Sequence, residues 1–301
     1  MTKPFLFLAN RQARQCALRA RQAETEFQKT GVPLIKPDLS NVRDLSRLIL
    51  DHADKVDRVI VVGGDGSINS TLSGLLKTQL PLGIIPAGTA NDLARTLNLP
   101  DTPVEAARLI LSDQKRVIDV AQVNDHLFIN AASLGLSVNI TRQLTRSLKK
   151  RWGPFAYALA SARAVFRAKP FHVHVTTEQE KVYLKTVQLV VGNGRYFGTG
   201  MTVHEQADID DHSLDLYSVG VYHWWSILAL LPSLRWGTHQ SYRSVYNARG
   251  RRFRIETRVP RPITADGEIL THTPADFLIH PKALTVFAPG MNLPTLSTPK
   301  I

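Results

Sequence analysis

Apolar residues in the first third of the chain follow two alternating patterns. Short apolar runs at residues 5–8, 59–62 and 82–85 are typical of buried β-strands. In residues 42–53 and 103–111 the apolar positions recur at the three- and four-residue spacing of a helix that buries one face. Because strands and helices alternate in this part of the chain, we expect an α/β domain built on a parallel sheet.

The pattern changes near Gln122. Beyond it, short segments that alternate or run apolar are separated by polar stretches, which is typical of an antiparallel β-sandwich. We therefore expect an α/β domain over residues 1–121, a β-rich domain over 122–290 and a tail over 291–301. The expected strands of the second domain are 123–133, 171–177, 183–191, 214–219, 253–256, 277–280 and 284–287.

The strand at 59–62 runs directly into the sequence GGDGSIN at residues 63–69, where a helix begins. Such a turn brings backbone N–H groups and a helix N-terminus to one point, which suits the phosphates of a nucleotide. Asp65 would repel phosphate unless Mg²⁺ or a substrate hydroxyl stood between them. On these residues alone, an ordinary tight turn between strand and helix explains the sequence equally well.

The strand at 82–85 is followed by a second turn of the same kind, PAGTANDLAR at residues 86–95. Thr89 or Asn91 could cap the helix that follows, and Asp92 falls in its first turn. Arg95 follows Asp92 by three residues, so the two can share the N-terminal end of that helix. Two such turns close together in the chain predict two phosphate-facing loops side by side in a parallel sheet.

These two motifs, together with TADGE at residues 264–268, resemble the lipid kinase family that includes bacterial diacylglycerol kinases and sphingosine kinases. The three motifs occur in the family's order, and the resemblance covers nearly the whole chain. It implies an ATP-dependent, Mg²⁺-dependent kinase with an α/β nucleotide-binding domain like that of NAD kinase and diacylglycerol kinase. It also implies an antiparallel β-sandwich that accepts the lipid, and an active site between the two domains.

The resemblance also implies which residues bind the nucleotide. After the first strand the family has an Asn-Pro-x-x-Gly loop, where this chain has arginine in place of both the proline and the glycine, so the arginines could pair with phosphates. An aspartate that helps to build the family's nucleotide site corresponds to Asp119, which could equally be a carboxylate at a strand edge. The implied nucleotide-binding residues are Asn10, Arg11, Arg14, Gly63, Gly64, Asp65, Gly66, Ser67, Ile68, Asn69, Thr89, Asn91, Asp92, Arg95 and Asp119.

Transfer of a phosphoryl group to an alcohol needs positioned phosphates, Mg²⁺ and a carboxylate that receives the hydroxyl proton. Asp65, helped by Asp92, is the expected Mg²⁺ ligand. By resemblance, Glu268 is the proton acceptor and Asp266 its partner, since the two flank Gly267 on a tight turn. In the simpler interpretation, Asp266 and Gly267 only form the centre of a hairpin.

A second metal site is implied at DIDDHSLD, residues 208–215. Clustered oxygen ligands suit Mg²⁺ or Ca²⁺, and the family holds a structural Mg²⁺ here. The resemblance assigns Asp211 as the side-chain ligand, with Asp208 and Ser213 contributing backbone carbonyls. The chain departs from the family pattern at His212, where the family has glycine. A β-turn with solvated carboxylates is the alternative.

The chain has 301 residues, a formal net charge of +12 and a single cysteine, Cys16, which excludes an internal disulfide. Nucleic acid, an anionic membrane and a phosphorylated substrate could each explain the charge, as could a merely basic surface. No nucleic-acid-binding motif is present, so an anionic membrane fits better. The basic segment 146–157 and the apolar segment 223–231 could contact lipid, although loop and core roles explain them more simply.

We find neither a signal peptide nor an apolar run of the roughly 20 residues that would span a bilayer, so we expect a cytoplasmic protein that is soluble or peripheral to the inner face of the membrane. A homodimer is compatible with the sequence. The leading hypothesis is a kinase acting on diacylglycerol, another glycerolipid or a sphingoid base. An NAD kinase also has Gly-Gly-Asp-Gly but is not expected to carry GTANDLAR. A nucleotide-binding regulator without activity is the third hypothesis. The presence of all four carboxylates expected to act in transfer opposes it: Asp65, Asp92, Asp266 and Glu268.

Overall fold

In the computed structural model, the chain divides into two compact units. The first unit comprises Met1–Gly88, Leu97–Ile118 and Leu284–Ile301, and the second comprises Thr89–Thr96 and Asp119–Ala283. Two segments therefore belong to a different unit from their neighbours in sequence: Thr89–Thr96, and the chain from Leu284 onwards. The structure describes residues 3–10, 13–40, 42, 44–136, 169–194, 196–197, 201–202, 208–220, 245–266 and 268–290.

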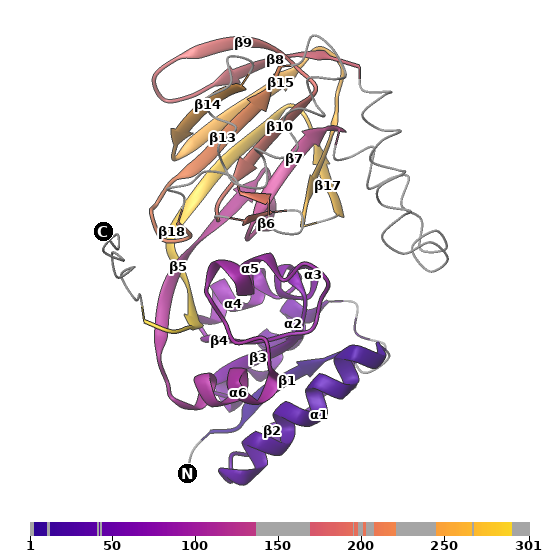
Figure 1. The fold of residues 1–301 in the computed structure, drawn as a ribbon, viewed down its shortest axis with the longest axis vertical. Coiled ribbons are helices and arrows are strands. Elements are labelled where there is room, and N and C mark those ends of the chain that lie inside the picture. Colours follow the sequence, from indigo (N-terminus) through magenta and orange to yellow (C-terminus); the bar gives the residue numbers. More distant parts are fainter. Residues whose placement is uncertain are drawn as a thin grey trace, which may run out of the picture. The chain divides into compact units, whose positions relative to one another are not determined.

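The first unit is built on a parallel sheet (Figure 1), whose strand order is β2-β1-β3-β4. Three of its strands, β1, β3 and β4, contain the apolar runs expected from the sequence. The strands are β1 (Phe5–Ala9), β2 (Leu34–Ile35), β3 (Arg58–Gly63) and β4 (Leu82–Pro86). The helices are α1 (Arg14–Lys29), α2 (Leu45–His52), α3 (Asp65–Asn69), α4 (Leu72–Thr78) and α6 (Pro103–Leu111), with a 3₁₀ turn at Ala53–Lys55.

Helix α1 packs on this sheet through one stripe. Cys16, Ala20, Ala23 and Phe27 recur at three- and four-residue spacing and are all buried. The Phe27 ring meets the rings of two β1 phenylalanines edge to face, with centroids 5.8 and 6.3 Å apart. The small residues let the helix approach the sheet closely, and Phe27 fills the space at its end.

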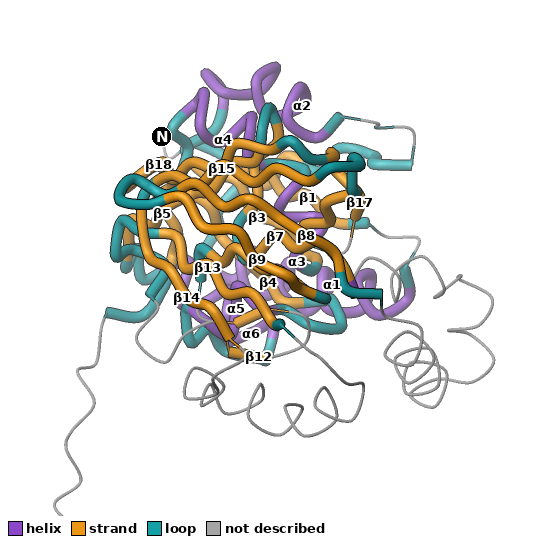
Figure 2. The backbone as a smooth tube through the Cα atoms, turned by 90° about the horizontal axis from the view of Figure 1, so that it is seen from above, coloured by secondary structure: helices purple, strands orange, loops and turns teal. Residues whose placement is uncertain are grey.

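The second unit contains two antiparallel arrays of strands that share one core. Along β8 the side chains alternate, with Phe171, Val173 and Val175 buried and His172 and His174 exposed. One core cluster joins buried residues of both arrays. The first array has the order β14-β13-β10-β7-β16-β17, and the second runs β18-β15-β8-β9, with β9, β8 and β15 side by side in Figure 2.

The elements of the second unit are short apart from two strands, β5 and β18, that it shares with the first unit. The expected α/β domain and antiparallel β-sandwich are both confirmed. Among the described residues, no helix is long and apolar enough to cross a membrane. The elements are β5 (Lys115–Val123), β6 (His126–Phe128), β7 (Ala131–Gly135), β8 (Phe171–Thr176), β9 (Lys181–Thr186), β10 (Gln188–Gly192), β11 (Tyr196–Phe197), β12 (Met201–Thr202), β13 (Leu214–Val219), β14 (Val245–Gly250), β15 (Arg252–Thr257), β16 (Pro262–Ala265), β17 (Glu268–His272), β18 (Ala275–Phe287) and α5 (Asp92–Thr96).

Candidate active site

The expected phosphate loop lies at the carboxyl edge of the parallel sheet. Ala9 of β1 pairs with Val62 of β3, and Gly63 pairs with Pro86 of β4, so the three strands end together. Asn10 and Gly64 directly follow β1 and β3 at this edge. Helix α3 begins at the next residue, Asp65, and its cap is the Gly64 backbone without a side-chain hydrogen bond. The predicted strand-to-helix turn is therefore present, with its acidic residue in the first turn.

Two positions of this loop, 63 and 66, carry glycine for different physical reasons. A Cβ on Gly63 would lie 2.6 Å from Ser67 Cβ, so the fold itself excludes a larger residue there. Gly66 is helical and exposed, and a Cβ on it would meet nothing within 4 Å. The chain's own packing thus gives no reason for glycine at 66, whereas close approach of a ligand would.

Asn69 ends the same short helix and points to a ligand in a second way. Its side-chain Oδ1 is shielded from water and has no hydrogen-bond partner within the described part of the chain. A buried amide oxygen without a donor is costly, and a nucleotide group could supply the missing donor. Gly66 and Asn69 together fit a nucleotide at this turn. Arg14 lies exposed at the start of α1, and Arg11 lies outside the described residues.

Arg19, which the sequence did not single out, fixes the end of β4 by hydrogen bonds. Arg19 of α1 donates from Nη1 to the Pro86 carbonyl oxygen at 2.7 Å and to the Asp101 carbonyl oxygen at 2.6 Å. Pro86 is the last residue of β4, so Arg19 fixes the point where the second expected loop begins. No motif marks Arg19, because its partners are backbone carbonyls distant in sequence.

The second expected loop, residues 89–95, lies in the second unit, whereas the first lies in the first unit. Its short helix is α5, preceded by Asn91 with a positive φ of 50°. Asp92 is 4% exposed and Arg95 is exposed, and that they share the N-terminal end of the helix stays a prediction. That the two loops lie side by side stays a prediction, as does the nucleotide contact of Thr89.

The hairpin formed by β16 and β17 carries two carboxylates, Asp266 and Glu268, which differ in their contacts and exposure. Asp266 has a φ of 48°, and its carboxylate accepts hydrogen bonds from Ile129 N at 3.4 Å and Asn130 Nδ2 at 3.3 Å. Glu268 begins β17 and is exposed. One carboxylate is therefore held by the β6–β7 connection, and the other faces outward. Gly267 lies outside the described residues.

Asn193 links the surroundings of this hairpin to Asp119. Its Nδ2 donates to the Asp119 carbonyl at 3.1 Å and the Ile129 carbonyl at 2.8 Å, and its backbone N–H donates to Asn130 O at 2.8 Å. Asn193 is 3% exposed. Neither Asn193 nor Asn130 was among the site residues expected from the sequence. The signal available was an asparagine between two glycines at a strand end, in Gly192–Gly194.

The Asp119 carboxylate is buried, with 1% exposure, and is already occupied by protein donors. Its Oδ2 accepts from His212 N at 2.6 Å and its Oδ1 from Lys282 N at 2.7 Å. The His212 ring nitrogen Nδ1 lies 3.1 Å from the same Oδ1. These contacts favour the structural alternative for Asp119, and a direct role in nucleotide binding stays a prediction.

The turn at residues 208–213 does not fit the divalent cation that the family resemblance implies. Asp211 Oδ1 accepts from Ser213 N at 3.0 Å, and its Oδ2 accepts from Asp208 N at 2.9 Å. Arg249 Nη2 lies 2.5 Å from the same Oδ2. Both carboxylate oxygens are thus taken by N–H donors, and a positive charge is already present. That Asp208, Asp211 and Ser213 are metal ligands stays a prediction, and these contacts count against it.

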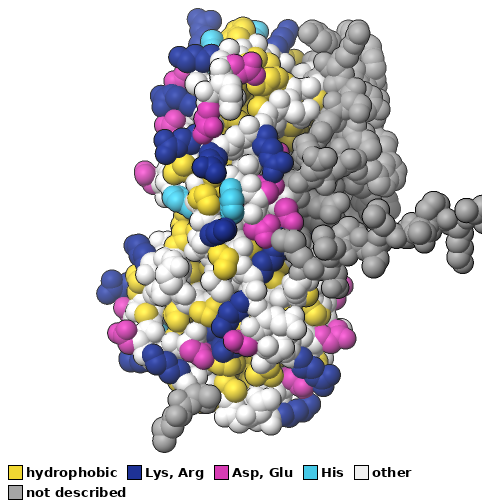
Figure 3. Space-filling model, turned by 90° about the vertical axis from the view of Figure 1, so that its left-hand side faces the viewer, with side chains coloured by type: hydrophobic (Ala, Val, Ile, Leu, Met, Phe, Trp, Pro, Cys, Tyr) yellow, Lys and Arg dark blue, Asp and Glu magenta, His cyan; other side chains and the backbone are white. Residues whose placement is uncertain are grey.

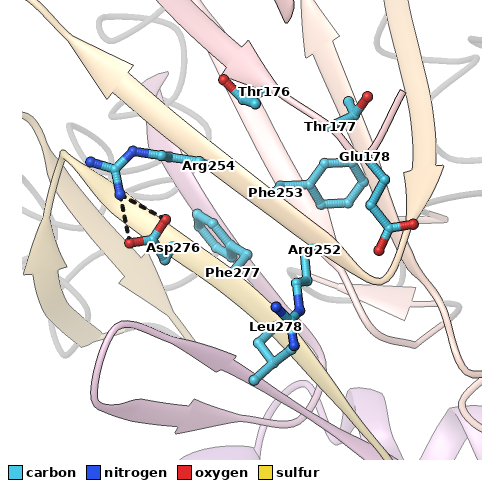
Figure 4. A pocket seen from close by; sticks show the side chains of 9 residues that line it. All are labelled: Thr176, Thr177, Glu178, Arg252, Phe253, Arg254, Asp276, Phe277 and Leu278. Atoms are coloured by element: carbon cyan, nitrogen blue, oxygen red, sulfur yellow. Dashed lines mark hydrogen bonds and ion pairs between the residues drawn. The ribbon is translucent and has the colours of Figure 1, made fainter. Parts of the chain in front are cut away.

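The described residues contain no group of three or more His, Cys, Asp or Glu side chains arranged to hold a metal ion. They do form a groove of about 480 Å³ on the second unit, lined by β8, β15, β18 and the turn after β8 (Figure 4). Arg254 donates both bonds drawn there to the Asp276 carboxylate, at 3.0 and 2.9 Å. None of the expected site residues lines this groove.

Family models match both parts of the chain. Residues 4–123 match the diacylglycerol kinase catalytic domain, and residues 130–288 match the YegS C-terminal NAD kinase beta sandwich-like domain. The first match assigns the class: the protein is a kinase with a catalytic domain of the diacylglycerol kinase type. The second covers more than half of the chain and assigns the family. The chain belongs to the YegS-like lipid kinases.

Individual relatives agree with this assignment. A Shewanella frigidimarina protein described as "Probable lipid kinase YegS-like" is 27% identical, over 84% of this chain and 83% of its own length. A Chromohalobacter salexigens protein of the same description is 36% identical over 54% of each chain. A crystal structure of a "putative diacylglycerol kinase" from Bacillus anthracis superposes with a TM-score of 0.82 at 25% identity, over 95% of each chain.

Proposed function

We propose that this kinase transfers the γ-phosphate of ATP to the hydroxyl group of a membrane lipid, such as diacylglycerol, another glycerolipid or a sphingoid base. The observation that carries the proposal is the acidic hairpin, in which Asp266 is held by two hydrogen bonds and Glu268 is exposed. A base must reach a substrate hydroxyl, and a neighbour that fixes the hairpin keeps that base in position. The relatives described as lipid kinases support the choice of acceptor.

On the nucleotide side, the turn at 63–69 would receive the phosphates of ATP. Its helix begins without a side-chain cap, Gly66 leaves space above the backbone, and the Asn69 amide oxygen is available as an acceptor. Asp65 and Asp92 are the carboxylates that would hold Mg²⁺ with the nucleotide. When bound, Mg²⁺ neutralises charge that develops on the phosphates during transfer.

On the acceptor side, Glu268 would take the proton from the lipid hydroxyl as its oxygen attacks the γ-phosphorus. Asp266 is a positioning residue in this proposal. Its carboxylate is bonded to Ile129 N and Asn130 Nδ2, so it ties the hairpin to the β6–β7 connection. Proton removal by a placed carboxylate typically contributes about 10²–10⁴-fold to the rate.

The same proposal extends to where the enzyme works. A net charge of +12 favours contact with anionic lipid, at roughly 1 kcal/mol per Lys or Arg near the surface. On the face drawn in Figure 3, the described Lys and Arg side chains are interspersed with Asp and Glu and gather into no single patch. We therefore propose weak, salt-sensitive contact with the cytoplasmic face of the membrane. The segments 146–157 and 223–231, expected as lipid contacts, lie outside the described residues.

The test is a transfer assay with labelled ATP, Mg²⁺, NAD and a panel of lipids, run on the wild type, Glu268→Gln and the control Glu178→Gln. Glu178 is an exposed carboxylate on a turn of the second unit, so its change matches the first in charge and size. We expect labelled lipid from the wild type and the control. Glu268→Gln should lower kcat at least about 100-fold with the KM for ATP within about twofold.

Two results would contradict the proposal. Label in NADP rather than in lipid would make the protein an NAD kinase, and tight ATP binding without turnover on any lipid would make it a regulator. Full activity of Glu268→Gln would leave the lipid kinase function intact but remove Glu268 as the base.

A further inference from the structure

The Asp211 turn and β14 meet through one guanidinium group. Arg249 lies in β14 directly opposite Asp215 of β13 in the antiparallel register. Its Nη2 is 2.5 Å from Asp211 Oδ2, and its Nε is 3.9 Å from Asp215 Oδ1. Asp215 is 6% exposed, and the side chain of Asp211 is 18% exposed. The Arg249 guanidinium therefore contacts two carboxylates that are both largely removed from water.

The remaining contacts of Asp211 close the turn on itself. Asp208 N and Ser213 N donate to its two oxygens, and Asp208 Oδ1 accepts from Ile209 N at 2.8 Å. Mg²⁺ requires near-octahedral oxygen ligands at about 2.0–2.1 Å, and an oxygen lone pair cannot serve a metal and an N–H donor together. Asp211 Oδ2 accepts from Asp208 N and Arg249, which uses both of its lone pairs, and the charge of the guanidinium opposes a metal ion at this carboxylate.

We propose that Arg249 takes the place of the structural divalent cation that the family pattern implies at this turn. The guanidinium joins the 208–213 turn to β14 and balances Asp211 and Asp215. Arginine suits this role because its planar fork is always protonated and bonds carboxylates in a fixed geometry. The second unit then needs no metal for its own stability. This inference does not depend on the acceptor lipid or on catalysis.

The first test uses the full-length wild-type chain without nucleotide, so that no MgATP contributes. Thermal unfolding is followed in excess EDTA, in millimolar Mg²⁺ and in millimolar Ca²⁺, together with hydrogen exchange of residues 208–219 and 245–250. We expect the same unfolding temperature and the same exchange in all three conditions. A rise in unfolding temperature that grows with the logarithm of cation concentration, and that Asp211→Asn abolishes, would overturn the proposal.

The second test removes the guanidinium. Arg249→Met removes the guanidinium from the shielded Asp211 carboxylate, so the unfolding temperature in EDTA should fall by about 4 °C or more. Millimolar Mg²⁺ or Ca²⁺ should restore part of that loss. The matched control is Arg254→Met, which also separates an arginine from an acidic partner on the same unit, but at Asp276, whose side chain is 64% exposed. We expect no response of the control to either cation.

A double variant keeps the test decisive if Arg249→Met does not fold. Asp211→Asn combined with Arg249→Met removes one charge of each sign, so the chain should fold and remain indifferent to cations. The proposal fails if Arg249→Met is as stable as the wild type in EDTA. It also fails if neither cation restores any stability to that variant, or if the double variant needs a cation to fold. None of these unfolding measurements uses ATP, so their outcome is independent of the outcome of the transfer assay.

Discussion

Replacing Gly66 by alanine separates binding from folding in the phosphate loop. Gly66 lies in α3, is exposed, and offers open space where a Cβ would be added. Alanine in a helix is favoured over glycine by about 0.5–1 kcal/mol, so stability should hold or rise slightly. If a phosphate approaches the backbone here, the added methyl group occupies that approach. The KM for ATP should then rise at least about tenfold, equivalent to about 1.4 kcal/mol.

The matched control is the same substitution at Gly74. There a Cβ would lie 2.7 Å from the Ser46 carbonyl oxygen and 2.8 Å from Ser46 Cα, at the contact between α4 and α2. Both atoms belong to backbone, so the clash cannot be relieved by a side-chain rotation. Overpacking of this kind costs about 1–3 kcal/mol, which exceeds the helix-propensity gain. Gly74→Ala should therefore lower stability without a specific effect on ATP.

The assay combines thermal unfolding of both variants with ATP-dependent kinetics at saturating lipid. For a chain of this size, about 1 kcal/mol shifts the unfolding temperature by about 2–4 °C, so the two variants are distinguishable. The reasoning is refuted if Gly66→Ala binds ATP as well as the wild type. It is also refuted if Gly66→Ala unfolds at a temperature as low as Gly74→Ala, because the space at Gly66 would then be needed by the fold.

Three further substitutions test other contacts. Asn130→Asp replaces the hydrogen-bond donor to Asp266 by a like charge. We expect kcat to fall at least about tenfold, the KM for ATP to stay unchanged and the pH profile of kcat to move to higher pH, whereas a purely structural loss would leave that profile in place. Arg19→Met removes two charge-assisted hydrogen bonds that α1 donates. It should lower the free energy of unfolding, measured in urea, by about 2–4 kcal/mol, and a change near zero would contradict the role of Arg19 in fixing the end of β4. Burial, together with the hydrogen bond that its hydroxyl donates to Glu180, raises the pKa of Tyr246 to about 12 from 10.0. Since the neutral form is favoured in the fold, the stability from this group is complete below pH 10 and is lost as pH rises towards 12, and Tyr246→Phe should flatten the fall in urea midpoint over that range.

The α/β unit was predictable because its signals are local. Three of its strands, β1, β3 and β4, contain short apolar runs, and α6 begins at Pro103 after the N-cap residue Thr102, whose Oγ1 accepts from Glu105 N. The buried stripe of α1 follows from helical spacing alone. The assignment of residues 89–96 to the second unit was not predictable. A five-residue helix has too few apolar positions to indicate which of two cores it joins.

Contacts across the second unit were also beyond the sequence. Arg249 is brought to Asp211 by the pairing of β13 with β14, and the register of that pairing is a long-range property rather than a local signal in the sequence. Asn130 reaches Asp266 through the pairing of β7 with β16 in the same way. Composition predicts which residue types are available for a site. The register of distant strands decides which of them meet.

His212, which stands where the family pattern has glycine, and Arg249 of β14 both contribute to holding this turn. His212 has a φ of 61°, where the family has glycine, and a non-glycine residue in this region costs about 1–2 kcal/mol. Its backbone N–H and its ring both contact the buried Asp119 carboxylate, so the side chain offsets the strain that its backbone incurs. Arg249 supplies, from the neighbouring strand, the positive charge that Asp211 requires. If Arg249 takes the place of the cation as proposed, side chains of the chain itself hold the turn, and only the nucleotide side of the proposed reaction has a use for Mg²⁺.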